Sequence, residues 1–167
     1  FKRDVLKDLS EACQREGIAL HFYYSHLDWG RLDYPLGRTG LGTGRPKDQQ
    51  DWKHYQKFMN QQLTELLTQY GPIGAVWFDG VWDHDSDATP FDWQLRPQYD
   101  LIHELQPSCL VANNHHLVPF EGEDVQIFER DLPGENKAGY SGENGVSKTL
   151  PLESCETMNR TWGYNIT

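Results

Sequence analysis

The sequence predicts an α/β protein in which parallel strands and outer helices form part of a (β/α)8 barrel. Amphipathic helices alternate with short apolar strands along most of the chain, and this order favours a parallel sheet with right-handed crossovers. Polar side chains follow the predicted strands, where parallel α/β folds place their sites. A full barrel takes about 250 residues. A chain of 167 residues is therefore expected to hold roughly half of one.

Three helices are predicted from apolar residues that recur along one face. Residues 4–16 carry such a face and stop at Gly17, and residues 52–70 carry the clearest one, after Asp51 as an N-cap. Residues 92–105 form the third. Because Pro97 lies inside that range, the regular part of this helix is expected to begin there.

The central strand is predicted at residues 73–79, where an apolar run ends in Asp79 and Gly80. The run does not alternate strictly, which is typical of a strand buried on both faces. A carboxylate at the end of such a strand is costly unless it is paired or used. Further strands are expected at 18–24, 109–112, 125–129 and 152–158. Two long loops, of a kind that often carries function, are expected at 30–50 and 131–150.

Composition narrows the classes of partner. The formal net charge of −10 repels phosphate backbones, so nucleic acid is not expected as a partner. No stretch reaches the roughly 18 apolar residues of a membrane span, and no signal peptide is expected. The three widely spaced cysteines form no CxxC pair, which argues against a thiolate zinc site. The start at Phe1, rather than Met, suggests a piece of a longer protein.

Two carboxylates stand at predicted strand ends. Asp79 ends the central strand and Glu129 ends the strand at 125–129, in a chain with six Trp and eight Tyr. Such a pair among aromatic side chains suits glycoside hydrolysis, in which one group attacks the anomeric carbon and the other protonates the leaving oxygen. The alternatives are a helix N-cap or a loop acid for Asp79 and a surface ion pair with Arg130 for Glu129.

A second polar group follows the strand at 109–112. His115 and His116 come after Asn113 and Asn114 and are expected to bind sugar hydroxyls or a metal. A metal-dependent α/β hydrolase that uses His84, His115 and His116 is one alternative. Its signal is weak, because no HExxH-type spacing occurs. The chain also carries no GxSxG elbow, P-loop or GxGxxG motif.

Four segments together resemble the α-L-fucosidases of glycoside hydrolase family 29. These are Phe22–Ser25 with Asp28 and Trp29, Tyr70–Gly80, Val111–Asn114, and Glu153–Asn159 with Trp162–Tyr164. The resemblance implies a retaining exo-hydrolase that releases α-L-fucose from fucosylated oligosaccharides or glycoconjugates, with no metal or organic cofactor. It implies Asp79 as the nucleophile and Tyr23 and Trp77 as lining of the fucose pocket. Trp29, His115 and His116 are expected as further substrate-binding residues.

The general acid/base has no fixed motif in that family. The segment 124–129 aligns best with the strand that carries it, which favours Glu129, followed by Glu135 and Glu153. A retaining mechanism would place this carboxyl about 5–5.5 Å from Asp79. Its pKa would be raised, so that the group starts protonated.

Two departures from the family matter. Many members have arginine where this chain has His115, and the paired histidines that hold the fucose hydroxyls come from strands before Phe1. The chain is therefore expected to be one segment, 1–167, of a catalytic barrel without its first and last strands. It is expected to need the rest of the parent domain as its partner and to be poorly active alone. A secreted, periplasmic or lysosomal-type location is expected by resemblance only. The other alternative is a non-catalytic, carbohydrate-binding relic of such a barrel.

Overall fold

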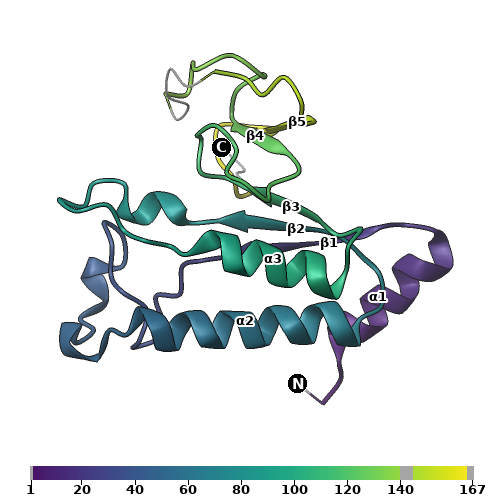
Figure 1. Ribbon diagram of the computed structural model, residues 1–167, viewed down its shortest axis with the longest axis horizontal. Coiled ribbons are helices and arrows are strands. Elements are labelled where there is room, and N and C mark those ends of the chain that lie inside the picture. The colour runs from purple at the N-terminus through teal and green to yellow at the C-terminus, as the bar shows by residue number, and fades with distance from the viewer. Residues whose placement is uncertain (1, 140–144, 165–167) are drawn as a thin grey trace.

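The computed structural model describes residues 2–139 and 145–164 and shows five short parallel strands (Figure 1). β1 (Leu20–Ser25), β2 (Ile73–Asp79) and β3 (Leu110–Asn113) form one sheet with β2 in the middle. β4 (Gln126–Glu129) and β5 (Leu152–Cys155) form a second parallel pair. A single parallel bridge between Ala112 and Val125 connects the two. The prediction of an α/β protein with parallel strands is confirmed.

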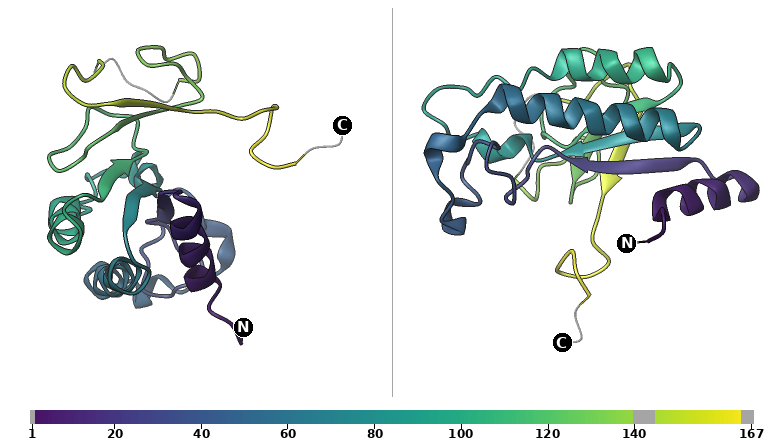
Figure 2. Two further views of the ribbon diagram at one scale, coloured as in Figure 1. Left: turned by 90° about the vertical axis from the view of Figure 1, so that its right-hand side faces the viewer. Right: turned by 90° about the horizontal axis from the view of Figure 1, so that it is seen from below.

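The three predicted helices are present. They are α1 (Val5–Glu16), α2 (Trp52–Gln69) and α3 (Leu95–Leu105). α2 and α3 lie side by side on one face of the three-stranded sheet (Figures 1 and 2). β4 and β5 lie beyond the edge of this sheet that β3 forms. Asp4 and Asp51 cap α1 and α2 by accepting backbone N–H bonds from Lys7 and His54. Each cap satisfies one of the free N–H groups of a first helical turn.

The expected start of the third helix at Pro97 is wrong by two positions, because α3 begins at Leu95. Pro97 is then the third residue of the helix, inside the first turn. The N–H groups of a first turn have no carbonyl partner within the helix, so the missing N–H of proline costs nothing there.

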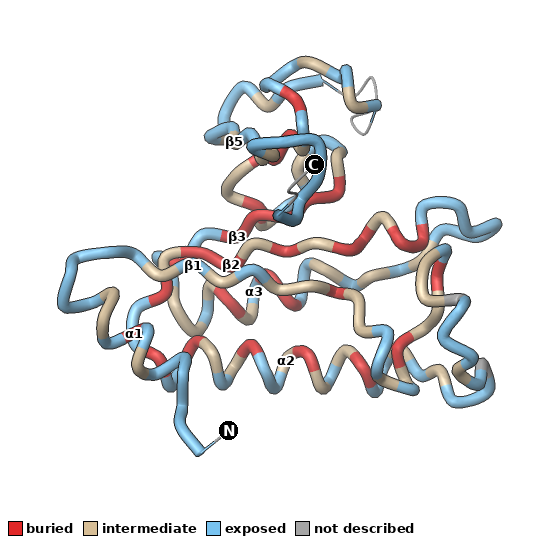
Figure 3. Tube along the Cα trace, turned by 180° about the vertical axis from the view of Figure 1, so that it is seen from behind, coloured by how far each residue is buried: buried red, intermediate tan, exposed pale blue. Residues whose placement is uncertain are grey.

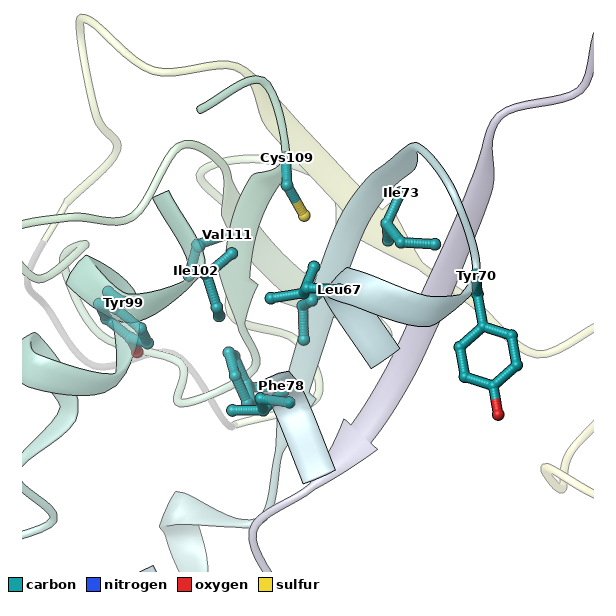
Figure 4. Packing of buried hydrophobic residues seen from close by; sticks show 10 residues of the cluster. Leu67, Tyr70, Ile73, Phe78, Tyr99, Ile102, Cys109 and Val111 are labelled. Carbon is teal, nitrogen blue, oxygen red and sulfur yellow. The ribbon is translucent and has the colours of Figure 1, made fainter. Parts of the chain in front are cut away.

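The hydrophobic core lies between the sheet and the two helices (Figure 4). It joins Leu63 and Leu67 of α2, Ile102 of α3, and Val76 and Phe78 of β2, all almost completely buried. The neighbouring residues Ala75 and Val76 point to opposite sides of β2, and both are buried. The central strand is therefore covered on both faces over these residues, as its apolar run predicts.

The apolar face of α1 is mostly open. Val5 is 58% exposed and Leu9 is 48% exposed, and the buried residue of this helix is Ser10, which donates a hydrogen bond to the carbonyl of Tyr70. Figure 3 shows the helix mainly in the colour of exposed residues. The spacing predicts the helix correctly, but the described residues place little against its apolar face.

The two long predicted loops contain no strand and no α-helix in their described parts. The first holds two short 3-10 turns, η1 (Leu41–Thr43) and η2 (Lys47–Gln49). A third 3-10 turn, η3 (Val81–His84), lies outside both loops and follows β2. Residues 140–144 of the second loop lie outside the described residues. Among the helices that are described, none has both the length and the apolar character needed to cross a membrane.

Candidate active site

The register of the strands brings their polar ends together. Ser25 of β1 pairs with Asp79 of β2, and Phe78 of β2 pairs with Asn113 of β3. The carboxyl ends of the three strands therefore lie next to one another. Glu129 ends β4 opposite Cys155 of β5. The two carboxylates that the sequence singles out thus both stand at the carboxyl ends of parallel strands, as expected of a site in this fold class.

Asp79 is held by donors on both of its oxygens. Its Oδ2 accepts a hydrogen bond of 2.7 Å from the Tyr23 hydroxyl, and its Oδ1 accepts bonds of 2.8 Å from the Gly80 amide and from Trp82 Nε1. Desolvation of the Tyr23 hydroxyl and the neighbouring Asp79 carboxylate raise the pKa of Tyr23, so this group keeps its proton and donates. These bonds are charge-assisted and fix the orientation of the carboxylate. The cap interpretation of Asp79 is wrong, because the N-cap of η3 (Val81–His84) is Gly80 and no side chain caps that turn.

One side chain links the two carboxylates. Asn114 Nδ2 lies 2.7 Å from Glu129 Oε2 and 3.5 Å from Asp79 Oδ1. The backbone N–H of Asn114 donates to the carbonyl of Phe78 at 2.9 Å, which ties it to β2. Because one nitrogen contacts both oxygens, their separation cannot exceed the sum of these two distances. Asp79 and Glu129 are therefore close enough to act on one substrate bond.

His116 completes the surroundings of Glu129. Its Nε2 lies 3.1 Å from Glu129 Oε2, and both side chains are largely buried. His116 has φ of 63°, in the left-handed region that a residue with a Cβ rarely adopts. Such backbone strain is maintained by the surrounding structure and is found most often at functional sites. The interpretation of Glu129 as one half of a surface ion pair with Arg130 is not what this geometry shows.

The expectation of a raised pKa for Glu129 is wrong for this structure. The hydrogen bond from His116 lowers the pKa of the Glu129 carboxyl, and the bond from Asn114 acts in the same direction. Burial of the carboxyl raises the pKa but is outweighed. The sequence offered no signal for this contact, because it requires the turn at His116 to fold back over β4.

Two hollows meet at Asp79. One, of about 470 Å³, is lined by both carboxylates together with Arg38, Trp82, Asp85, His116, Gly139 and Trp162. The other, of about 420 Å³, lies on the β1 side of Asp79. It is lined by Asp79 and Trp82 with Tyr23, Ser25, Leu27, Asp28, Trp29 and Gly30. Trp29 thus lines the same hollow as Asp79, and Trp29 Nε1 donates to Thr39 Oγ1 at 3.1 Å.

Trp77 lies beside Tyr23 and reaches a residue of β5. The two rings stack with centroids 5.5 Å apart, and Trp77 Nε1 donates to Glu153 Oε1 at 2.8 Å. Glu153, the third choice for the acid/base, is therefore engaged by an indole. Glu135, the second choice, pairs with Lys137 at 2.7 Å and lines a separate small hollow. Of the three, Glu129 is the one that shares a hollow with Asp79.

His115 is placed away from the two carboxylates. It is 7% exposed, and its Nε2 lies 3.0 Å from Glu123, a buried carboxylate that also accepts a bond from the Tyr99 hydroxyl. His115 Nδ1 accepts the amide of Leu117, so both ring nitrogens are occupied. His84 pairs with Asp87. Among the described residues no group of three possible metal ligands converges, and the three histidines of the metal alternative hold three different carboxylates.

Three side chains of the site were not predicted from the sequence. Trp82 and Asn114 contact Asp79 directly, and Arg38 reaches the same hollow from the first long loop. Trp82 follows Asp79 at the spacing of one turn, which was an available signal. Arg38 lies far from Asp79 in sequence, and only the folded loop brings the two together.

The fold and the paired carboxylates define an α/β protein whose site lies at the carboxyl ends of parallel strands. Within that class, the chain belongs to the alpha-L-fucosidase family, whose sequence model matches residues 1–167.

Relatives and solved structures agree with this assignment. The chain is 34% identical over 112 residues to alpha-L-fucosidase 1 of Arabidopsis thaliana, a match that covers 66% of this chain and 19% of the relative. The solved alpha-L-fucosidase isoenzyme 1 of Paenibacillus thiaminolyticus is 31% identical with a TM-score of 0.68, over 98% of this chain and 40% of that one. Alpha-L-fucosidase AlfC of Lactobacillus casei, solved with α-L-fucose, is 25% identical with a TM-score of 0.60, over 92% of this chain and 46% of that one. The chain thus spans about a fifth of the curated relative and under half of the solved proteins.

Proposed function

We propose that this chain supplies the two reacting carboxylates of a retaining α-L-fucosidase, with Asp79 as nucleophile and Glu129 as general acid/base. The observation that carries the proposal is the Asn114 amide, which contacts both carboxylates at the ends of different strands. A relic that only binds sugar would have no need to hold two carboxylates so close together, since each repels the other when ionised.

In the first step, an Asp79 oxygen attacks C1 of the fucosyl ring and forms an ester bond. The bond between C1 and the glycosidic oxygen breaks, and its electrons stay on that oxygen. Glu129 gives its proton to the same oxygen, so the leaving group departs as a neutral alcohol. Tyr23 and Trp82 donate to Asp79 in the unreacted enzyme and fix the orientation of the carboxyl group that attacks.

In the second step, Glu129 accepts a proton from a water molecule while the water oxygen bonds to C1. The ester bond to Asp79 breaks, fucose is released with its original configuration, and both carboxyl groups return to their starting states. The hydrogen bonds of Glu129 to Asn114 and His116 hold the carboxylate in place for this transfer.

The spacing of the two groups supports retention. The upper limit set by the two Asn114 distances is below the roughly 6.5 Å that is the minimum separation in inverting enzymes, which need room for a water between the carboxyl groups. A close pair of this kind suits a direct attack by one carboxylate on C1.

The rest of a barrel is proposed to come from the remainder of a larger catalytic domain. Two features support a barrel: the strands follow one another in sequence order through parallel contacts, and Trp77 of β2 reaches across to Glu153 of β5. That contact requires the row of strands to curl, so that side chains of one face point toward each other. The open site beside β1 would then be closed by earlier strands, and fucosylated glycans would be the substrate.

The test is Asp79→Gly in a complete catalytic domain that carries this chain, assayed on an aryl α-L-fucoside. Loss of the nucleophile should lower kcat by about 10³- to 10⁵-fold. Added azide should restore turnover by entering the vacated space, with β-L-fucosyl azide as the product.

Asp87→Gly is the matched control, because Asp87 pairs with His84 and lines neither of the two hollows at Asp79. Near-normal activity of the Asp79 variant, or a loss as large in the Asp87 variant, would remove Asp79 from its proposed role.

A further inference from the structure

The hollow that contains Glu129 extends beyond the two reacting carboxylates. Arg38, Asp85 and Trp162 also line it, and none of the described contacts joins these three to Asp79 or Glu129. In the proposed reaction the glycosidic oxygen must reach Glu129. The group on the far side of that oxygen must therefore enter this extension, while the fucosyl ring stays against Asp79.

Arg38 is held in place by its backbone rather than by its side chain. The Arg38 amide donates to the carbonyl of Asp83 at 2.8 Å, and Thr39 donates both its amide and its hydroxyl to Asp83 Oδ1. Asp83 is fully buried and also accepts the Tyr34 hydroxyl. Gly37 packs so closely that an added Cβ would lie 2.3 Å from the Asp83 carbonyl oxygen. The loop that carries Arg38 is thus clamped onto η3.

The guanidinium of Arg38 lies over the Trp82 ring, 5.0 Å from its centroid. Arg38 is exposed, and the described residues give its side chain no hydrogen bond or ion pair. Its donors are thus available at the mouth of the hollow. Stacking on an aromatic face orients a guanidinium plane without using its N–H groups.

Asp85 supplies acceptors near those donors. It lines the same hollow and is exposed. Partial desolvation of the carboxyl raises the pKa of Asp85, and the Arg38 charge acts in the opposite direction. A donor and an acceptor that line one hollow match a pair of neighbouring hydroxyls on a sugar ring, each of which can donate and accept.

The charge of the hollow distinguishes neutral from anionic sugars. Three carboxylates line it, against the single guanidinium of Arg38, and the whole chain carries a formal net charge of −10. A carboxylated or sulfated leaving group would meet repulsion from Asp85 and Glu129. The indole of Trp162, 58% exposed, adds an apolar face on which a pyranose can pack.

We propose that Arg38, Asp85 and Trp162 form a binding site for the leaving group of the substrate, and that this site takes a neutral pyranose. The inference rests on the proposed function, because Glu129 defines the leaving-group side. The loop that carries Arg38 would then determine which leaving groups are accepted. This site is separate from the position of the fucosyl ring beside Tyr23.

The experiment compares two substrates in a complete catalytic domain that carries this chain. One is a neutral disaccharide with a terminal α-L-fucosyl group, and the other is α-L-fucosyl fluoride, whose leaving group is too small to reach Arg38. Arg38→Met keeps a chain of similar length over Trp82 and removes the donors. The ratio of kcat/KM for the disaccharide to that for the fluoride should fall about tenfold, the loss expected for a hydrogen bond from a charged group. Arg38→Lys should recover part of this ratio.

Arg15→Met is the matched control, since Arg15 is an exposed cation on α1, outside both hollows at Asp79. An unchanged ratio in Arg38→Met would overturn the inference, as would a wild-type preference for a fucosylated disaccharide that carries a uronic acid over the neutral one. A wild-type domain that hydrolyses neither the fluoride nor an aryl fucoside would instead overturn the proposed function.

Discussion

The two carboxylates sit in regions of very different construction. Asp79 ends the middle strand of a three-stranded sheet that is backed by α2 and α3, with Val76 and Phe78 completely buried just before it. Glu129 ends a strand of a two-stranded pair whose outer member, β5, alternates between exposed and half-buried residues. One isolated bridge joins the two regions through the backbone. The position of Asp79 thus depends on a core backed by two helices. Glu129 follows two buried residues, Ile127 and Phe128, that lie outside this core, and it is also held by polar contacts with the turn after β3.

This difference explains why one site residue is better determined than the other. A buried strand has one register that keeps its apolar side chains in the core, so its last residue has a fixed place. In the β4–β5 pair the burial is confined to β4, where Ile127 and Phe128 are buried, and Glu129 is held in addition by Asn114 and His116. The turn that follows β3 therefore adds to the burial of β4 in fixing Glu129.

The largest expected effect tests the contrast in burial. Ile102→Ala should lower the free energy of unfolding of the chain by about 2–5 kcal/mol, because it leaves a cavity in the core beside Phe78. Leu152→Ala on β5 removes a side chain that is 38% exposed and should cost about 0.5 kcal/mol or less. Urea unfolding followed by far-UV circular dichroism measures both. Equal losses would show that β5 is as firmly packed as the central sheet.

The next effect tests the link between the regions. Asn114→Ala removes the amide that contacts both carboxylates and should lower kcat in a complete catalytic domain by about 10- to 100-fold, as expected for a hydrogen bond to a charged group. Asn159→Ala, in the exposed segment after β5, serves as the control. If kcat of the Asn114 variant stayed within twofold of wild type while its fold was unchanged, the two regions would be coupled by other contacts.

The smallest effect is a shift of a pH profile. The hydrogen bond from His116 lowers the pKa of Glu129, so His116→Gln should raise that pKa. A general acid works only while protonated, and activity is lost as pH rises through its pKa. The basic limb of kcat/KM should therefore move to higher pH in this variant. His103→Gln alters an ion pair with Asp124, and neither residue lines the hollows at Asp79. This control variant should leave the basic limb of kcat/KM in place. A basic limb that moves to lower pH would contradict the assigned role of His116.

Much of the fold followed from local patterns in the sequence. The apolar periodicity of residues 52–70 and the run before Asp79 each describe contacts with a single core, so they predicted α2 and β2 within a residue of their observed bounds. The position of Asp79 after a buried strand also predicted a site residue, because a carboxylate there requires partners. The resemblance to a known family selected Glu129, which shares a hollow with Asp79.

The tertiary structure decided which polar residues meet. His115 and His116 are neighbours in sequence, yet one turns to the buried Glu123 and the other to Glu129, a division set by the left-handed backbone at His116. Arg38 reaches the hollow that contains both carboxylates only because buried Asp83 holds its loop against η3. The sequence by itself determined the elements and the strand-end carboxylate, since both depend on local periodicity and burial. The partners of those carboxylates depend on turns and loops that bring distant residues together, and local patterns carry no information about such contacts.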